Sequence, residues 1–199
     1  MLYPIILIKL LKQIAYLLQF LLDLDIKLFH FINGTLSNPL FDSIMPFITN
    51  NNNWYVFYGL TALYLIAYGG IRGRAAVISV VTLLLCTVNS YSVVKELIAR
   101  PRPCELPGVN LLINCPPDFS MPSGHAVDTF AAAVLLSYFY PRLKYFFFVM
   151  AFFVALSRIY CGVHYPSDSL VGCLYGILFG TGMVFILKAL NKKLNFMTR

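Results

Sequence analysis

Long hydrophobic runs alternate with short polar breaks along most of the chain. A helix needs about 20 apolar residues to cross a bilayer, and backbone groups in lipid must be paired within their own segment. Five runs approach this length and are predicted to be transmembrane helices: Trp54–Gly70, Ala75–Val94, Gly124–Tyr140, Tyr145–Cys161 and Asp168–Leu187. The pattern predicts an all-α integral membrane protein, a bundle of five to six transmembrane helices. We expect residues 1–199 to form a single domain, with the bundle core at 54–187.

The N-terminal region, residues 1–53, has a different pattern. Polar side chains recur every three or four positions from Lys9 to His30, which is typical of one polar stripe on an otherwise apolar helix. This stripe fits an amphipathic helix in the membrane interface, or a sixth span with its polar side packed on the bundle. We favour the interfacial or partly inserted helix and expect His30 to be structural. Breaks are predicted at Asn33-Gly34 and Asn50–Asn53.

Basic residues predict the orientation of the bundle. They gather in two tight connections, Ile71–Arg74 and Pro141–Lys144, and in the tail at residues 188–199. With five alternating spans these three places lie on one face, which the positive-inside rule makes cytoplasmic. The opposite face, periplasmic in a bacterium, carries the loops 95–123 and 162–167. We therefore expect a multi-pass protein of the bacterial inner membrane.

The composition supports a membrane protein. The chain is 59% hydrophobic and 12% charged, whereas soluble domains are about a quarter charged. The net charge of +7 could suggest nucleic acid, but the basic residues lie at the ends of apolar runs and form no long cluster. We expect the bilayer, and no nucleic acid, as a partner. The cysteines and histidines lack zinc-site spacing, so neither a metal nor a cofactor is predicted. The oligomeric state stays open.

The predicted outer face is unusual because it also carries basic residues near the span ends. These are Lys95, Arg100, Arg102 and Arg158. Charges at membrane depth are costly and usually mark function, and an anion is their natural partner. Acidic residues lie on the same face, so a structural ion-pair network is an equally good interpretation of these charges alone.

Two predicted helix starts on this face carry candidate chemistry. Ser123 can cap the helix that begins at Gly124, and free N–H groups beside a glycine suit a phosphate, although an ordinary capped helix is the plainer interpretation. His164 and Asp168 are four residues apart, so the carboxylate can fix the imidazole tautomer and leave one nitrogen free to attack. The alternative is a pair that only caps the helix. His125 could protonate a leaving group. Together these groups suit phosphoryl transfer without a metal.

At these positions the sequence resembles the type 2 phosphatidic acid phosphatase family of membrane enzymes. The first part of the family signature, Lys, six residues and Arg-Pro, is matched from Lys95 to Pro103. The second is matched by Pro122–His125, and the third, Ser-Arg, five residues, His, three residues and Asp, by Ser157–Asp168. All three parts match in order and without gaps, which makes the match specific.

The resemblance implies a role for each matched residue. His164 would attack phosphorus and become a transient phosphohistidine, Asp168 would hold and polarise it, and His125 would protonate the leaving group. The phosphate would be bound by Lys95, Arg102, Ser123, Gly124 and Arg158.

Bacterial members of the family act on undecaprenyl diphosphate, phosphatidylglycerol phosphate or lipid A 1-phosphate. The resemblance thus implies a lipid phosphatase whose substrate is a lipid phosphate. Alternatives are a lipid phosphotransferase with the same chemistry and a non-enzymatic anion-binding membrane protein.

Two features of the outer loop lie outside the signature. Arg100 adds a basic side chain that could contact a diphosphate or sugar headgroup. Cys104 and Cys115 share the loop, and disulfides persist in the periplasm. We predict that they form a disulfide; two free thiols are the alternative.

Overall fold

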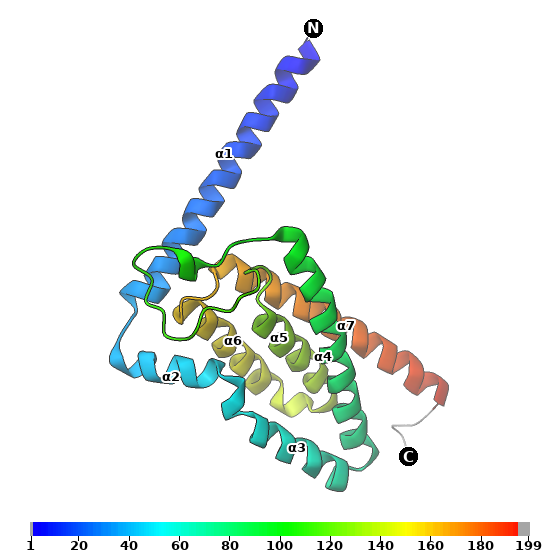
Figure 1. Cartoon of the computed structure of the whole chain (residues 1–199). Coiled ribbons are helices and arrows are strands. Elements are labelled where there is room, and N and C mark those ends of the chain that lie inside the picture. The colour runs from blue at the N-terminus through cyan, green and yellow to red at the C-terminus, as the bar shows by residue number, and fades with distance from the viewer. Residues whose placement is uncertain (1, 195–199) are drawn as a thin grey trace.

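The computed structural model describes residues 2–194, which form helices joined by loops and contain no strand (Figure 1). The predicted all-α fold is therefore confirmed. The α-helices are α1 (Leu2–His30), α2 (Pro39–Thr49), α3 (Tyr55–Tyr68), α4 (Gly70–Ile98), α5 (Gly124–Phe139), α6 (Lys144–Tyr160) and α7 (Pro166–Leu194).

Three helical segments of the described chain are long and apolar enough to cross a membrane: Gly70–Ile98, Pro141–Tyr160 and Pro166–Lys193. Helices α3 and α5 are shorter, with 14 and 16 residues. At 1.5 Å per residue such helices span only about 20 to 25 Å, less than the ~30 Å hydrocarbon core. The multi-spanning character is supported, and the number of spans stays a prediction.

The connection between the first two predicted spans lies earlier than expected. The prediction of a turn at Ile71–Arg74 is wrong, because α4 begins at Gly70 and contains these residues. Gly70 has a φ of 59°, and a Cβ on Gly69 would lie 2.5 Å from the carbonyl oxygen of Leu65. Glycine is the residue that tolerates such a turn. The second hairpin turns where predicted, through the 3-10 helix Pro141–Leu143.

Helix α5 lies at the centre of the bundle and packs against α4, α6 and α7 (Figure 1). Three glycines of α7, at 172, 176 and 180, face α5 directly. A Cβ on Gly176 would lie only 2.3 Å from the carbonyl oxygen of Val127. Small residues allow this close approach of helix backbones, as is common in membrane proteins. The contact sets the spacing between the starts of α5 and α7.

The helix ends near the predicted cytoplasmic residues meet at one end of the bundle. Ala75 of α4, Phe139 of α5 and Leu187 of α7 belong to one hydrophobic cluster. The motif residues lie at the opposite ends of these helices. Helix α7 continues to Leu194, so the first part of the predicted tail is helical. Residues 195–199 lie outside the described part of the chain.

The N-terminal region consists of two helices. Helix α1 extends away from the bundle (Figure 1), and its side chains between residues 9 and 24 are exposed. Near its end, Asp25 and Phe29 are buried. The two predicted breaks are the π-helix Phe31–Thr35 and the 3-10 helix Asn51–Asn53. An interfacial position for this region stays a prediction.

Candidate active site

The predicted site residues come together where four helix ends meet one loop. Lys95 lies in the last turn of α4, Arg158 in the last turn of α6 and Asp168 in the first turn of α7. Ser123 immediately precedes α5. The loop 99–123 crosses over these ends (Figure 1) and carries Arg102. Residues far apart in sequence thus share one buried site.

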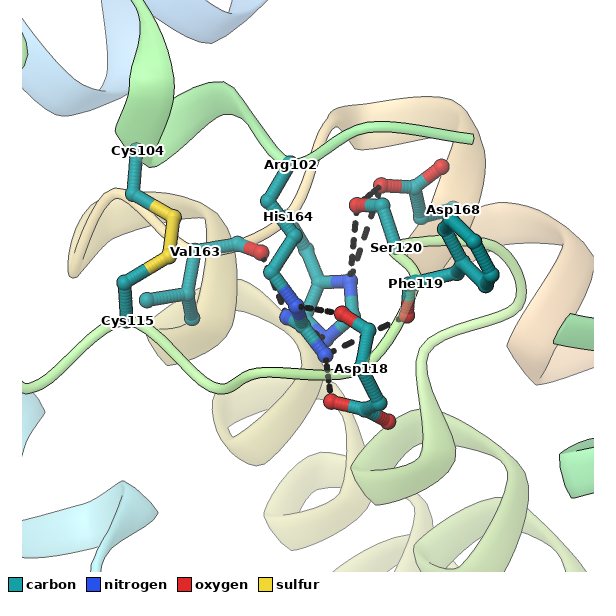
Figure 2. The surroundings of a disulfide bond; sticks show 9 residues. All are labelled: Arg102, Cys104, Cys115, Asp118, Phe119, Ser120, Val163, His164 and Asp168. Atoms are coloured by element: carbon teal, nitrogen blue, oxygen red, sulfur yellow. Dashed lines mark hydrogen bonds and ion pairs between the residues drawn. A yellow bond between two sulfur atoms is a disulfide. The ribbon is translucent and has the colours of Figure 1, made fainter. Parts of the chain in front are cut away.

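His164 lies just before α7 and is only 1% exposed. Its Nε2 accepts a hydrogen bond from Nη1 of Arg102 at 3.1 Å, and its Nδ1 lies 3.5 Å from Oδ2 of Asp168 (Figure 2). Because a guanidinium can only donate, Nε2 carries the lone pair and Nδ1 the proton. Burial, helped by the charges of Arg102 and Arg158, lowers the pKa of His164 to about 3. The imidazole is therefore neutral at pH 7, as a nucleophile must be.

The carboxylate of Asp168 is fully buried and held by several donors. Its Oδ2 accepts from the Tyr165 N–H at 2.8 Å and from Ser120 Oγ at 2.5 Å, and its Oδ1 accepts from Arg100 Nη1 at 2.6 Å. Such partners fix the direction in which Asp168 faces His164. Ser120 was not identified from the sequence, where no motif marks it.

Three buried cations gather at the site, and the charges of two of them, Arg102 and Arg158, act on His164. The exposed fractions of Lys95, Arg102 and Arg158 are 5%, 4% and 6%, and their charges repel one another. The carboxylate that contacts two of them is Asp118, which pairs with Lys95 and, at 2.7 Å, with Arg102. Burial would raise the pKa of Asp118, but Lys95 and Arg102 lower it. Buried charges need compensation, so this cluster favours a further anion.

Two buried polar atoms beside these cations have no hydrogen-bond partner within the described residues: Ser123 Oγ and Arg158 Nε. Buried polar atoms are almost always satisfied, so such exceptions point to a ligand. Gly124 adjoins Ser123, and a Cβ there would lie 2.9 Å from the ring of Tyr91. The start of α5 thus has no room for a side chain at position 124.

His125 lies in the first turn of α5, and α2, which carries no residue of the three motifs, reaches it. The ring of His125 lies beside the main chain of Thr49. The Oγ1 of the same threonine accepts from Arg158 Nη1 at 2.8 Å. Thr49 ends α2 and is 3% exposed. Nothing in the sequence indicated that α2 would reach the site.

Arg100 lies between two carboxylates. Its Nη2 is 2.7 Å from Asp25 Oδ2 and its Nη1 is 2.6 Å from Asp168 Oδ1. Burial would lower the pKa of Arg100, but Asp168 and Asp25 raise it. Arg100 also lines an outer pocket of about 480 Å³ with Arg102 and Phe119. The headgroup contact predicted for it stays a prediction.

The structure joins Cys104 and Cys115 in a disulfide (Figure 2). This bond closes the loop that carries Arg102 on one side and Asp118 on the other. Within residues 2–194, no group of three or more His, Cys, Asp or Glu side chains is placed to hold a metal ion.

Comparison with known proteins decides the family. The model of the PAP2 superfamily matches residues 73–192. The chain belongs to this superfamily. The match covers α4 to α7 and includes every residue of the three motifs, so the resemblance seen in the sequence is confirmed.

Several relatives are named as phosphatases of lipid phosphates. The undecaprenyl-diphosphatase of Sulfolobus acidocaldarius is 32% identical over 76% of this chain and 73% of its own. The lipid A 4'-phosphatase of Bacteroides thetaiotaomicron is 29% identical over 89% and 83%. The crystal structure of Aquifex aeolicus LpxE has a TM-score of 0.64 at 28% identity, covering 81% of this chain and 94% of that one. The chain is therefore a multi-pass membrane enzyme, a hydrolase of phosphate esters in a lipid phosphatase family.

Proposed function

We propose that the enzyme removes phosphate from a lipid phosphate or diphosphate at the outer face of the inner membrane, through a phosphohistidine on His164. The observation that carries this proposal is the neutral, buried His164 among three buried cations. Relatives named for undecaprenyl diphosphate and lipid A support a lipid substrate.

In the first half-reaction, Nε2 of His164 attacks phosphorus while the bond from phosphorus to the lipid oxygen breaks. His125 acts in its protonated form, gives its proton to that leaving oxygen and is left neutral. Asp168, on Nδ1, stabilises the positive charge that develops on the ring of His164. The equatorial oxygens are bound by cations and by helix-start donors. These groups are Lys95, Arg102, Arg158, Ser123 Oγ and the Gly124 N–H.

In the second half-reaction, water attacks the phosphorus of the phosphohistidine and His125 accepts a proton from that water. The N–P bond breaks, its electron pair returns to Nε2, and inorganic phosphate leaves. His164 is again neutral, so the enzyme is ready for another lipid. No step requires a metal, because positioning and fixed charge supply most of the catalysis of phosphoryl transfer.

The location of the site supports an outer-face reaction. The predicted cytoplasmic residues lie near the hydrophobic cluster of Ala75, Phe139 and Leu187, at the bundle end opposite Lys95 and Asp168. By the positive-inside rule, the end with the site faces outward.

The proposal is tested by phosphate release from purified protein in detergent with a chelator present. The substrates are undecaprenyl diphosphate, phosphatidylglycerol phosphate and lipid A 1-phosphate, each also given to His164→Ala. Release that survives the chelator and is lost in the variant is expected, and acid-labile phosphate should be trapped on the wild type. No release from any lipid by folded protein would overturn the proposal, and transfer to a second lipid would indicate a phosphotransferase.

A further inference from the structure

Asp25 is a buried carboxylate on a helix that is otherwise largely exposed. It is 7% exposed, whereas the side chains of α1 from residues 9 to 24 are exposed. Four residues further on, Phe29 is fully buried and packs edge-on against Tyr165 with ring centroids 5.6 Å apart. Burial of a carboxylate is costly unless it is paired and hydrogen-bonded. The partners of Asp25 therefore indicate its role in the structure.

The carboxylate of Asp25 contacts the start of α7 and Arg100. Its Oδ1 accepts from the Ser167 N–H at 2.8 Å, and its Oδ2 accepts from Ser167 Oγ at 2.5 Å and from Arg100 Nη2 at 2.7 Å. Pro166 is the first residue of α7, so the Ser167 N–H is one of the free donors of that helix. A side chain of α1 thus caps α7 across the fold.

Arg100 carries this contact on to the catalytic pair. Its Nη1 donates to Ser167 Oγ at 2.7 Å and to Asp168 Oδ1 at 2.6 Å, and its guanidinium lies 4.0 Å from the ring centroid of Tyr165. One guanidinium therefore bridges Asp25 and Asp168, with its plane held by an aromatic ring. Such a planar fork fixes the direction of its partners better than a point charge does.

We infer that Asp25 and Arg100 are positioning residues that hold Asp168 toward His164, which makes α1 a working part of the active site. The inference rests on the proposed function, since it assigns roles relative to His164. Arg100 occupies one of the six unspecified positions of the first motif, and Asp25 lies outside the family match at 73–192.

If the contact only docked α1 on the bundle, breaking it would not lower kcat selectively while leaving KM unchanged. The first test is Asp25→Asn, which keeps an acceptor for the Ser167 N–H but loses the ion pair with Arg100. We expect kcat to fall about tenfold, as for other changes to residues that orient a catalytic group, with KM within about twofold. Asp23→Asn is the matched control, because Asp23 is exposed on the same helix and bonds only Gln19 in the described contacts. It should behave as wild type.

The second test is the coupling between the two residues. Arg100→Gln should lower kcat at least as much as Asp25→Asn, and the double variant should be no worse than Arg100→Gln, because both changes break the same chain of contacts. Arg100→Lys keeps the charge but loses the planar guanidinium, so its kcat should also fall. It serves as the alternative variant if Asp25→Asn fails to fold in detergent.

Vanadate binding gives a readout that does not need turnover. Vanadate resembles the five-coordinate transition state, so its Kd by calorimetry should rise in step with the fall in kcat. Normal kcat and normal vanadate affinity in folded Asp25→Asn or Arg100→Lys would overturn the inference, as would strictly additive losses in the double variant. If the wild type releases no phosphate, the proposed function fails, and vanadate affinity alone decides the inference.

Discussion

Two serines of the site are both fully buried, yet their surroundings differ. Ser120 Oγ bonds Asp168, whereas Ser123 Oγ has no partner within the described residues. Removing an unsatisfied buried hydroxyl changes the free energy of unfolding little. The same removal weakens binding of a ligand that forms a hydrogen bond with that hydroxyl. We expect Ser123→Ala to retain or slightly raise the thermal stability and to lower kcat/KM about tenfold. Thermal unfolding and phosphate release on the same preparation check this.

Ser120→Ala is the matched comparison. It removes a made hydrogen bond and leaves the buried Asp168 with one donor fewer, so both stability and activity should fall, stability by about 1 to 2 kcal/mol. If Ser123→Ala were as unstable as Ser120→Ala, the unpartnered hydroxyl would have a structural and not a ligand-binding role.

The buried, neutral His164 predicts a pH dependence of stability. Its folded pKa is about 3, below the ordinary value of 6.5. Below pH 6.5 the unfolded state therefore binds a proton that the folded state does not. Stability decreases as the pH is lowered from 6.5 to about 3. The contribution of one such group is about 1.4 kcal/mol per pH unit.

His164→Gln should remove this contribution, so its stability should decline less steeply than that of wild type between pH 6.5 and 4.5. Unfolding midpoints in detergent at several pH values measure the two slopes. Parallel curves would mean that His164 is protonated in the folded protein, contrary to the expectation.

The residues that could be predicted from the sequence are those in contiguous motifs. His164 and Asp168 are only four residues apart at the start of α7, and Ser123 directly precedes α5, so local spacing was enough to mark them. Asp25 and Thr49 reach the site through tertiary packing of α1 and α2. No local spacing encodes such contacts, which is why sequence reasoning missed them.

At the scale of helices, the contact between α5 and α7 sets the distance between the two catalytic ends. Gly176→Ala would place a Cβ 2.3 Å from the Val127 carbonyl oxygen, so the helices must separate. We expect a loss of about 1 to 3 kcal/mol, as for overpacked cores, together with reduced kcat. Gly182→Ala is the control on the same helix, because its Cβ would meet nothing within 4 Å. It should be neutral or slightly stabilising.

The disulfide closes the segment next to Arg102, which contacts His164. The double variant Cys104→Ser/Cys115→Ser should raise KM several-fold, because Arg102 and Asp118 flank the closed loop and would be held less firmly. Reductant should bring the wild type to the same KM and leave the double variant unchanged. Cys86→Ser, at an exposed free cysteine, is the control. Unchanged KM after complete reduction, verified by thiol labelling, would show that the loop is held without the bond.

Hydrophobic runs predicted the positions of the bundle helices because each run must pair its own backbone in lipid. The boundaries were less predictable. The turn lies at Gly69–Gly70 because Gly70 has a positive φ and a Cβ on Gly69 would clash with the Leu65 carbonyl oxygen. The gap between the apolar runs had placed it at residues 71–74. The N-terminal polar stripe correctly predicted one helix, α1. The break between α1 and α2 contains Asn33, whose side chain bonds the main chain of Asn110 and Tyr160.

At the scale of the whole molecule, the two ends of the bundle differ in chemistry. One end gathers the buried cations and histidines, and the other carries basic side chains at helix ends, such as Lys188 over the ring of Tyr138. Substrate lipids in the outer leaflet could reach only a site that faces outward. Orientation is therefore part of the proposed function and can be measured separately from activity.

We expect single cysteines at the two ends to react from opposite sides of the membrane. In a background with Cys86, Cys161 and Cys173 replaced by serine, Leu111→Cys in the outer loop should react with an impermeant maleimide in intact cells. Arg142→Cys, in the turn before α6, should react only after the membrane is opened. Both positions are exposed in the folded protein, so burial cannot explain a difference between them. The reverse pattern would place the site on the cytoplasmic face and restrict its substrates to lipids of the inner leaflet.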